Sequence, residues 1–159
     1  MPAQNKFLGF TLIELLVAVA IGAILTSVSL AAFRGYGDRE QLRQAGSTLV
    51  TNLRSVQQKS LAGEKPAACD ADDKLAGYKV SYVDESSYQI EAECLVGTPE
   101  AKAMTLPDRV TFSGSFSQFS FPVLKSGVSG APVTISLTAG ANTYQVTVDT
   151  SGLIRGEML

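Results

Sequence analysis

One long apolar segment limits what this chain can fold into. From Phe10 to Phe33 there are 24 residues, and Glu14 is the only charged residue among them. As a helix the segment would span roughly 36 Å, more than the hydrocarbon core of a bilayer at about 30 Å. It is too long for the apolar region of a signal peptide and has no polar face for a core helix. A membrane-spanning helix over 10–33 is therefore predicted.

The charge before this segment sets its expected orientation. Residues 1–9 form a short polar leader that carries one positive charge, Lys6. Basic residues flanking a spanning helix favour the cytoplasmic side. We therefore expect a single-pass protein of the cytoplasmic membrane, with everything after residue 33 outside the cytoplasm.

Glu14 is the anomaly within the apolar segment. A carboxylate in a bilayer costs a few kcal/mol unless it has a partner, so such residues are functional candidates. The alternative is that Glu14, close to the end of the segment, reaches the aqueous interface and has only a solvated role. The residues alone leave both interpretations open.

After the apolar segment the pattern becomes amphipathic. Residues 34–62 place apolar side chains at steps of three and four, which puts them on one helical face; they are Leu42, Ala45, Leu49, Leu53 and Val56. Gly35 and Gly37 are expected to weaken the helix near its middle. Gly63 and Pro66 are expected to end it.

Residues 63–159 are predicted to form a β-rich head. Apolar and polar residues alternate in 78–82 and 88–94, a hairpin pattern, and further short strands fit 109–113, 118–121, 133–137, 143–148 and 153–155. Phe112, Phe119 and Phe121 are expected to form an aromatic core cluster. The predicted class is α+β: one long N-terminal helix packed on a small antiparallel β head.

The composition argues against several kinds of function. The chain has no His, which removes the commonest general base and metal ligand, and no other nucleophile–base pair is suggestively spaced. We therefore expect no enzyme, no cofactor and no metal. Asp70, Asp72 and Asp73 lack the glycine and the terminal glutamate of a calcium loop and are interpreted as a solvated loop. The net charge of −2, with scattered Lys and Arg, gives no support to nucleic-acid binding.

Two cysteines, Cys69 and Cys94, lie in the predicted head. Outside the cytoplasm a disulfide between them is the natural interpretation. Two free buried thiols are the alternative, because the sequence shows neither the compartment nor the pairing directly.

The start of the apolar segment is specific. Gly9-Phe10-Thr11-Leu12-Ile13-Glu14-Leu15-Leu16-Val17 resembles the prepilin signature of type IV pilins and type II secretion pseudopilins. The resemblance implies that a prepilin peptidase cleaves between Gly9 and Phe10 and methylates the new N-terminal Phe10. It also implies that Glu14 pairs with the N-terminal amine of a neighbouring subunit. The implied partners are other pilin subunits, the peptidase, an inner-membrane assembly platform and membrane lipid before assembly.

A looser resemblance covers the helix and the C-terminal strands. The segments 119–122, 133–137, 144–148 and 151–155 are similar to the end of the FimT/GspH-type minor pilins. Many major pilins carry a proline where this chain has Ala31, which also favours a minor subunit. The resemblance implies a structural subunit of a type IV pilus or a secretion pseudopilus. The alternative is a tip-located minor pilin that binds DNA for natural transformation.

Overall fold

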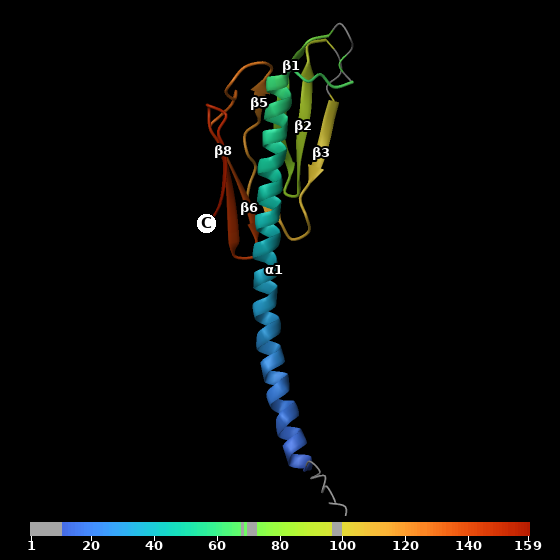
Figure 1. Cartoon of the computed structure of the whole chain (residues 1–159), viewed down its shortest axis with the longest axis vertical. Coiled ribbons are helices and arrows are strands. Elements are labelled where there is room, and N and C mark those ends of the chain that lie inside the picture. Colours follow the sequence, from blue (N-terminus) through green and yellow to red (C-terminus); the bar gives the residue numbers. More distant parts are fainter. Residues whose placement is uncertain (1–10, 68, 70–72, 97–99) are drawn as a thin grey trace, which may run out of the picture. The chain divides into compact units, whose positions relative to one another are not determined.

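The computed structural model describes residues 11–67, 69, 73–96 and 100–159, except for the side chains of residues 28–35 and 100 (Figure 1). Its contacts divide the chain into two compact units, one ending at Gly37 and the other, the head, running from Asp38 to Leu159. Each unit is described by itself.

One helix, α1 (Leu12–Ala62), accounts for both predicted helical segments. Its C-terminal end is closed by a Schellman motif. The N–H of Glu64 donates to the carbonyl of Lys59 (2.9 Å), and the N–H of Gly63 donates to that of Ser60 (3.1 Å). Gly63 has a φ of 65°, which glycine adopts without a steric penalty. Gly63 therefore ends the helix, as the sequence predicts.

The head contains two four-stranded antiparallel sheets. The first has the order β3-β2-β1-β5, and the second has the order β4-β6-β7-β8. The strands are β1 (Leu75–Asp84), β2 (Ser87–Cys94), β3 (Glu100–Thr105), β4 (Thr111–Phe112), β5 (Phe119–Pro122), β6 (Val133–Ala139), β7 (Asn142–Val148) and β8 (Ile154–Met158). The α+β class and the antiparallel head that the sequence predicts are confirmed.

The predicted hairpin is formed by β1 and β2, with Val80 opposite Ile90. Asp84 organises the turn, because its carboxylate accepts bonds from the N–H of Ser86 (2.8 Å) and from the hydroxyl of Ser87 (2.7 Å). Two further predicted strands, β6 and β7, form a second hairpin with Ile135 opposite Val146. Alternating patterns in both pairs thus predicted the correct strands.

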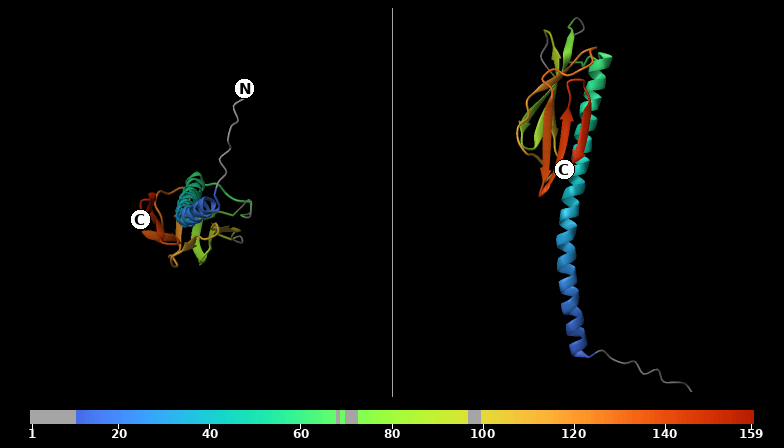
Figure 2. Two further views of the ribbon diagram at one scale, coloured as in Figure 1. Left: turned by 90° about the horizontal axis from the view of Figure 1, so that it is seen from below. Right: turned by 90° about the vertical axis from the view of Figure 1, so that its left-hand side faces the viewer.

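The head's core lies between α1 and the two sheets (Figure 2). The helical face predicted from the sequence is buried, with Leu42 and Leu53 at 0% exposure and Leu49 at 1%. Polar bonds also fasten the helix to each sheet. Asn52 donates to the hydroxyl of Tyr88 on β2 (2.8 Å), and Arg54 donates to the carbonyl of Ile154 on β8 (3.1 Å). Residues 38–62 of α1 therefore belong to the head.

The expected aromatic cluster is also in the core. Phe112, Phe119 and Phe121 are all buried, and Phe119 and Phe121 meet edge to face with ring centroids 5.8 Å apart. Phe116, which the sequence did not single out, joins the rings of Phe112 and Phe119. The cluster is structural, as expected.

The strand prediction was wrong at two places. β3 was not predicted, because its residues, Glu-Ala-Lys-Ala-Met-Thr, favour helices or surfaces over strands. The strand expected at 109–113 is reduced to Thr111–Phe112. A turn precedes it, in which Arg109 has a φ of 68° and the N–H of Val110 donates to the carbonyl of Pro107. Positive φ is incompatible with an extended strand.

Candidate functional site

The first turn of α1 is closed by a capping box between Thr11 and Glu14. The N–H of Glu14 donates to the hydroxyl of Thr11 (3.3 Å), and the N–H of Thr11 donates to Oε2 of Glu14 (3.5 Å). Thr11 is the N-cap and Glu14 the third helical residue, the spacing this motif requires. The positive end of the helix dipole also stabilises the negatively charged carboxylate. Glu14 therefore has a local structural role, which is to cap the start of the helix.

The helix surface that follows the cap is apolar and exposed. All of residues 11–27 are exposed, and Glu14 carries the only charge among them. The large apolar side chains on this surface are Leu12, Ile13, Leu15, Leu16, Val17, Val19, Ile21, Ile24 and Leu25, which are between 48% and 82% exposed. They lie on all sides of the helix, unlike the single buried stripe that α1 presents in the head. Such a surface needs an apolar environment supplied by something other than this unit.

The hydroxyl groups in this segment are satisfied by the helix itself. Thr26 donates to the carbonyl of Gly22 (2.7 Å), and Ser27 donates to that of Ile24 (2.8 Å). A helix in an apolar environment must pair its polar groups internally, because no water is present to do so. These two residues therefore add little polar cost to the exposed surface.

Several expected features reach beyond the described residues. Gly9 and Phe10, the expected cleavage and methylation positions, and the leader 1–9 lie outside them. The predicted spanning segment 10–33 also includes Phe10 and the side chains of 28–33, which are not described.

Within the part of the chain that the structure describes, no helix has both the length and the apolar character of a membrane span.

The disulfide between Cys69 and Cys94 is present. The two Cα atoms are 5.8 Å apart, and the bond ties the segment after α1 to the end of β2. Nearby, Oδ1 of Asp73 accepts bonds from the N–H groups of Lys74 (2.7 Å) and Val96 (3.0 Å). Asp73 thus stabilises the chain beside the disulfide. Asp70 and Asp72, the other acids of that loop, lie outside the described residues.

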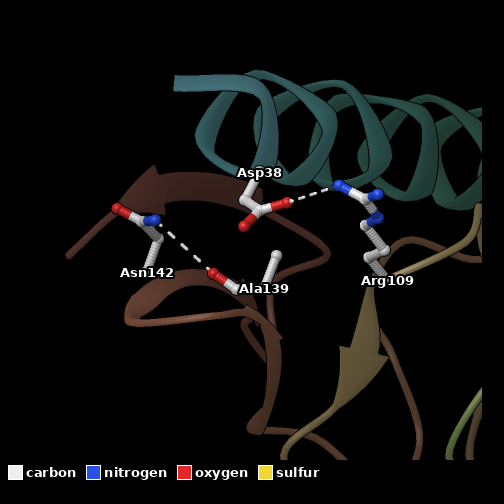
Figure 3. A network of polar contacts seen from close by, with 4 residues as sticks. All are labelled: Asp38, Arg109, Ala139 and Asn142. Carbon is white, nitrogen blue, oxygen red and sulfur yellow. Dashed lines mark hydrogen bonds and ion pairs between the residues drawn. The ribbon is translucent and has the colours of Figure 1, made fainter. Parts of the chain in front are cut away.

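Several charged residues of the head form ion pairs with one another. Lys79 on β1 pairs with Glu91 (2.8 Å) and Glu93 (3.5 Å) on β2, and this hydrogen bonding to Glu91 raises the pKa of Lys79 above its ordinary value. Arg109 pairs with Asp38 at 3.5 Å, beside the β6–β7 turn in which Asn142 donates to the carbonyl of Ala139 (Figure 3). In the described residues, no group of three or more Cys, Asp or Glu is placed to bind a metal.

Sequence reasoning missed Thr11. The signal was present, because a threonine followed three residues later by glutamate before an apolar run is the sequence form of a capping box. The prediction weighed Glu14 as a buried charge or as one solvated at the interface, and so did not ask what it bonds within its own helix.

Comparison with known proteins gives two matches. Residues 4–30 match the family model described as the prokaryotic N-terminal methylation motif. The chain is also 26% identical over 136 residues to a fimbrial protein of Pseudomonas aeruginosa, covering 86% of this chain and 80% of that protein. No solved structure matches the chain. The chain thus combines an N-terminal methylation motif, a pilin-like α+β fold and a distant similarity to a fimbrial protein.

Proposed function

We propose that this protein is a structural subunit of a type IV pilus or a type II secretion pseudopilus, and a minor one of the FimT/GspH kind. The observation that carries the proposal is that the methylation motif at 4–30 coincides with an exposed apolar helix surface. A surface of this kind is suited to membrane lipid before assembly and to neighbouring helices in a filament. The head would then lie outside the cytoplasm, where the Cys69–Cys94 disulfide is stable.

Processing follows from the motif. Prepilin peptidase would cleave between Gly9 and Phe10 and methylate Phe10. The cut would leave an α-amine directly before the Thr11 cap, close to the carboxylate of Glu14 in sequence. A buried amine and a buried carboxylate are each costly alone and tolerable as a pair. Glu14 would accordingly guide docking by accepting the amine of a neighbouring subunit.

The processing step is tested on filaments sheared from the cell surface. We expect the intact mass and the N-terminal sequence to begin at a methylated Phe10. A chain that begins at Met1, or that occurs only in the membrane fraction, would contradict the proposal. The abundance of the chain relative to other filament subunits distinguishes a minor from a major subunit.

The docking role of Glu14 is separable from its capping role. Glutamine can replace glutamate in a capping box, so Glu14→Gln keeps the helix start and removes only the charge. Thr11→Val removes the capping hydroxyl and keeps the charge. We expect Glu14→Gln to reduce assembly into sheared filaments at least tenfold, with Thr11→Val close to wild type. Glu40→Gln, an exposed carboxylate in the head, is the matched control. Equal assembly of Glu14→Gln and wild type would refute the docking role.

DNA binding is not favoured by any specific observation. Three basic groups of the head, Lys59, Lys79 and Arg109, are paired with acids, and the chain as a whole has a net charge of −2. A DNA-binding surface requires basic groups that are free to neutralise phosphates. We therefore propose the structural function alone.

A further inference from the structure

Gly37 is a glycine in the middle of α1 that no packing contact requires. A Cβ built at Gly37 would meet nothing within 4 Å, whereas a Cβ at Gly46 of the same helix would overlap Tyr144. Glycine lowers the helix equilibrium at a position about fivefold relative to alanine, and Gly35 adds a second such position. The contacts of the chain also divide it directly after Gly37. The helix is therefore weakened immediately before the head begins.

A signal for the start of a helix follows the two glycines. Asp38-Arg39-Glu40-Gln41 has the form of a capping box. In this motif the N-cap side chain accepts the N–H of the third helical residue, and a Glu or Gln at that position bonds back to the N-cap N–H. Within an unbroken helix the motif has no use, because the N–H of Gln41 already donates to the carbonyl four residues earlier. Aspartate is also among the weaker helix formers in a helix interior.

The two features do not coincide at other positions along α1. Gly22 has equally open surroundings, but Ala-Ile-Leu-Thr follows it, which is no start signal. Ser55-Val56-Gln57-Gln58 has the form of a capping box, but no glycine precedes it, and Leu53 and Val56 hold this part of the helix in the core. Open glycines followed at once by a start signal therefore distinguish residues 35–41 from the rest of the helix.

Asp38 is fastened to the head. Its Oδ1 accepts a bond from Arg109 at 3.5 Å, and its other carboxylate oxygen lies beside Gly140 in the β6–β7 turn (Figure 3). One turn further along the helix, Leu42 is completely buried. These contacts lie within the head, so they persist if the helix opens before Asp38. A carboxylate accepts several hydrogen bonds, so the pair with Arg109 is compatible with capping.

We propose that Asp38 is a latent N-cap and that α1 opens between Gly35 and Asp38 into two helices. In the open state the carboxylate of Asp38 accepts the N–H of Gln41, and residues 39–62 remain helical and packed in the head. The segment before Asp38 can then change its direction without loss of the core, whose helical part begins at Leu42. This inference concerns a single chain and holds whether or not the chain assembles into a filament.

Amide hydrogen exchange of the full chain in detergent micelles, measured residue by residue by NMR, tests the opening. The open state leaves the N–H groups of Arg39 and Glu40 without partners, whereas Leu42 still donates within its own helix. We expect protection factors of Arg39 and Glu40 roughly tenfold below that of Leu42. Gly37→Ala favours the closed helix and should raise them about fivefold. Equal protection of Arg39, Glu40 and Leu42 in the wild-type chain would overturn the inference.

A matched pair of variants separates a latent cap from a helix that is merely weak. Asp38→Thr and Asp38→Val introduce side chains of the same shape and similar helix propensity, and both remove the ion pair with Arg109. Threonine can cap a helix and valine cannot, so valine destabilises the open state alone. Protection factors of Arg39 and Glu40 should therefore be about fivefold higher in Asp38→Val than in Asp38→Thr. Equal protection in the two variants would overturn the inference, because residue 38 would then have no part in the opening.

Discussion

Gly46 allows α1 to approach the second sheet closely, and its replacement by alanine should destabilise the head. A Cβ built at Gly46 would overlap ring carbons of Tyr144 and would lie 2.6 Å from its Cγ. The ring cannot retreat easily, because Tyr144 is buried and its hydroxyl and Cε1 also lie close to Gly156. At an unconstrained helical site, Gly→Ala would instead gain about 1 kcal/mol.

Two opposing effects, overpacking and helix propensity, decide whether Gly46→Ala stabilises or destabilises the head. Overpacking of a well-filled core costs about 1–3 kcal/mol, and part of this is offset by the helix propensity of alanine. We expect a net loss of about 1–2 kcal/mol for Gly46→Ala. For a head of about 120 residues this lowers Tm by roughly 4–8 °C. Gly37→Ala is the control, because a Cβ there meets nothing within 4 Å. It should leave Tm unchanged or raise it.

The assay is thermal unfolding of the full chain in micelles, followed by near-UV circular dichroism of the tyrosines. Gly46→Ala is also measured in a Tyr144→Leu background, where the clashing ring is absent. There the loss should disappear, and the double-mutant cycle should report a coupling of about 1–3 kcal/mol. If Gly46→Ala raises Tm as Gly37→Ala does, the reasoning is refuted.

Three further predictions concern the head. Replacing Cys69 and Cys94 together by serine should lower the free energy of unfolding by about 2–4 kcal/mol, because the unfolded chain loses its cross-link. Calorimetry should show a lower Tm. An unchanged Tm in non-reducing buffer would contradict this. Burial raises the pKa of the Tyr88 hydroxyl above its ordinary value. The contribution of Tyr88 to the free energy of unfolding is therefore complete below pH 10 and is lost as the pH rises above 10. In urea unfolding between pH 8 and 11, the free energy of unfolding should fall less steeply with pH for Tyr88→Phe than for wild type. Equal slopes would contradict this role of Tyr88. Ser60 is buried and donates to the carbonyl of Phe121 (2.7 Å), so Ser60→Ala should cost about 1 kcal/mol by urea unfolding, and no loss would show that the bond is not stabilising.

Much of the head could be predicted because its signals are local. The apolar steps from Leu42 to Val56 are set by the helical period alone, and all of those positions are buried. The β1–β2 and β6–β7 hairpins join strands that are adjacent in sequence, so alternation and a short turn were sufficient.

The remaining features depend on contacts between distant segments. β3 pairs with β2 although its Ala- and Lys-containing sequence has low strand preference, so the sheet and not the propensity decides its conformation. The hollow between α1 and strands β1 to β3 could not be predicted for the same reason. Its lining comes from α1, three strands and Pro66, and no sequence pattern places Val56 beside Lys102. The prepilin motif, in contrast, is contiguous and could be recognised directly from the sequence.

In the proposed filament, the single charge at Glu14 would have a consequence for the spacing along the bundle of helices. Apolar contacts are non-directional, so neighbours packed along residues 12–27 could slide by one residue, about 1.5 Å, with little change in energy. A carboxylate that must meet a partner at hydrogen-bond distance permits few axial offsets. One polar residue inside a coiled coil fixes its register in the same way. Glu14 would then determine the axial position of each helix relative to the next. The apolar residues would determine how strongly the helices associate.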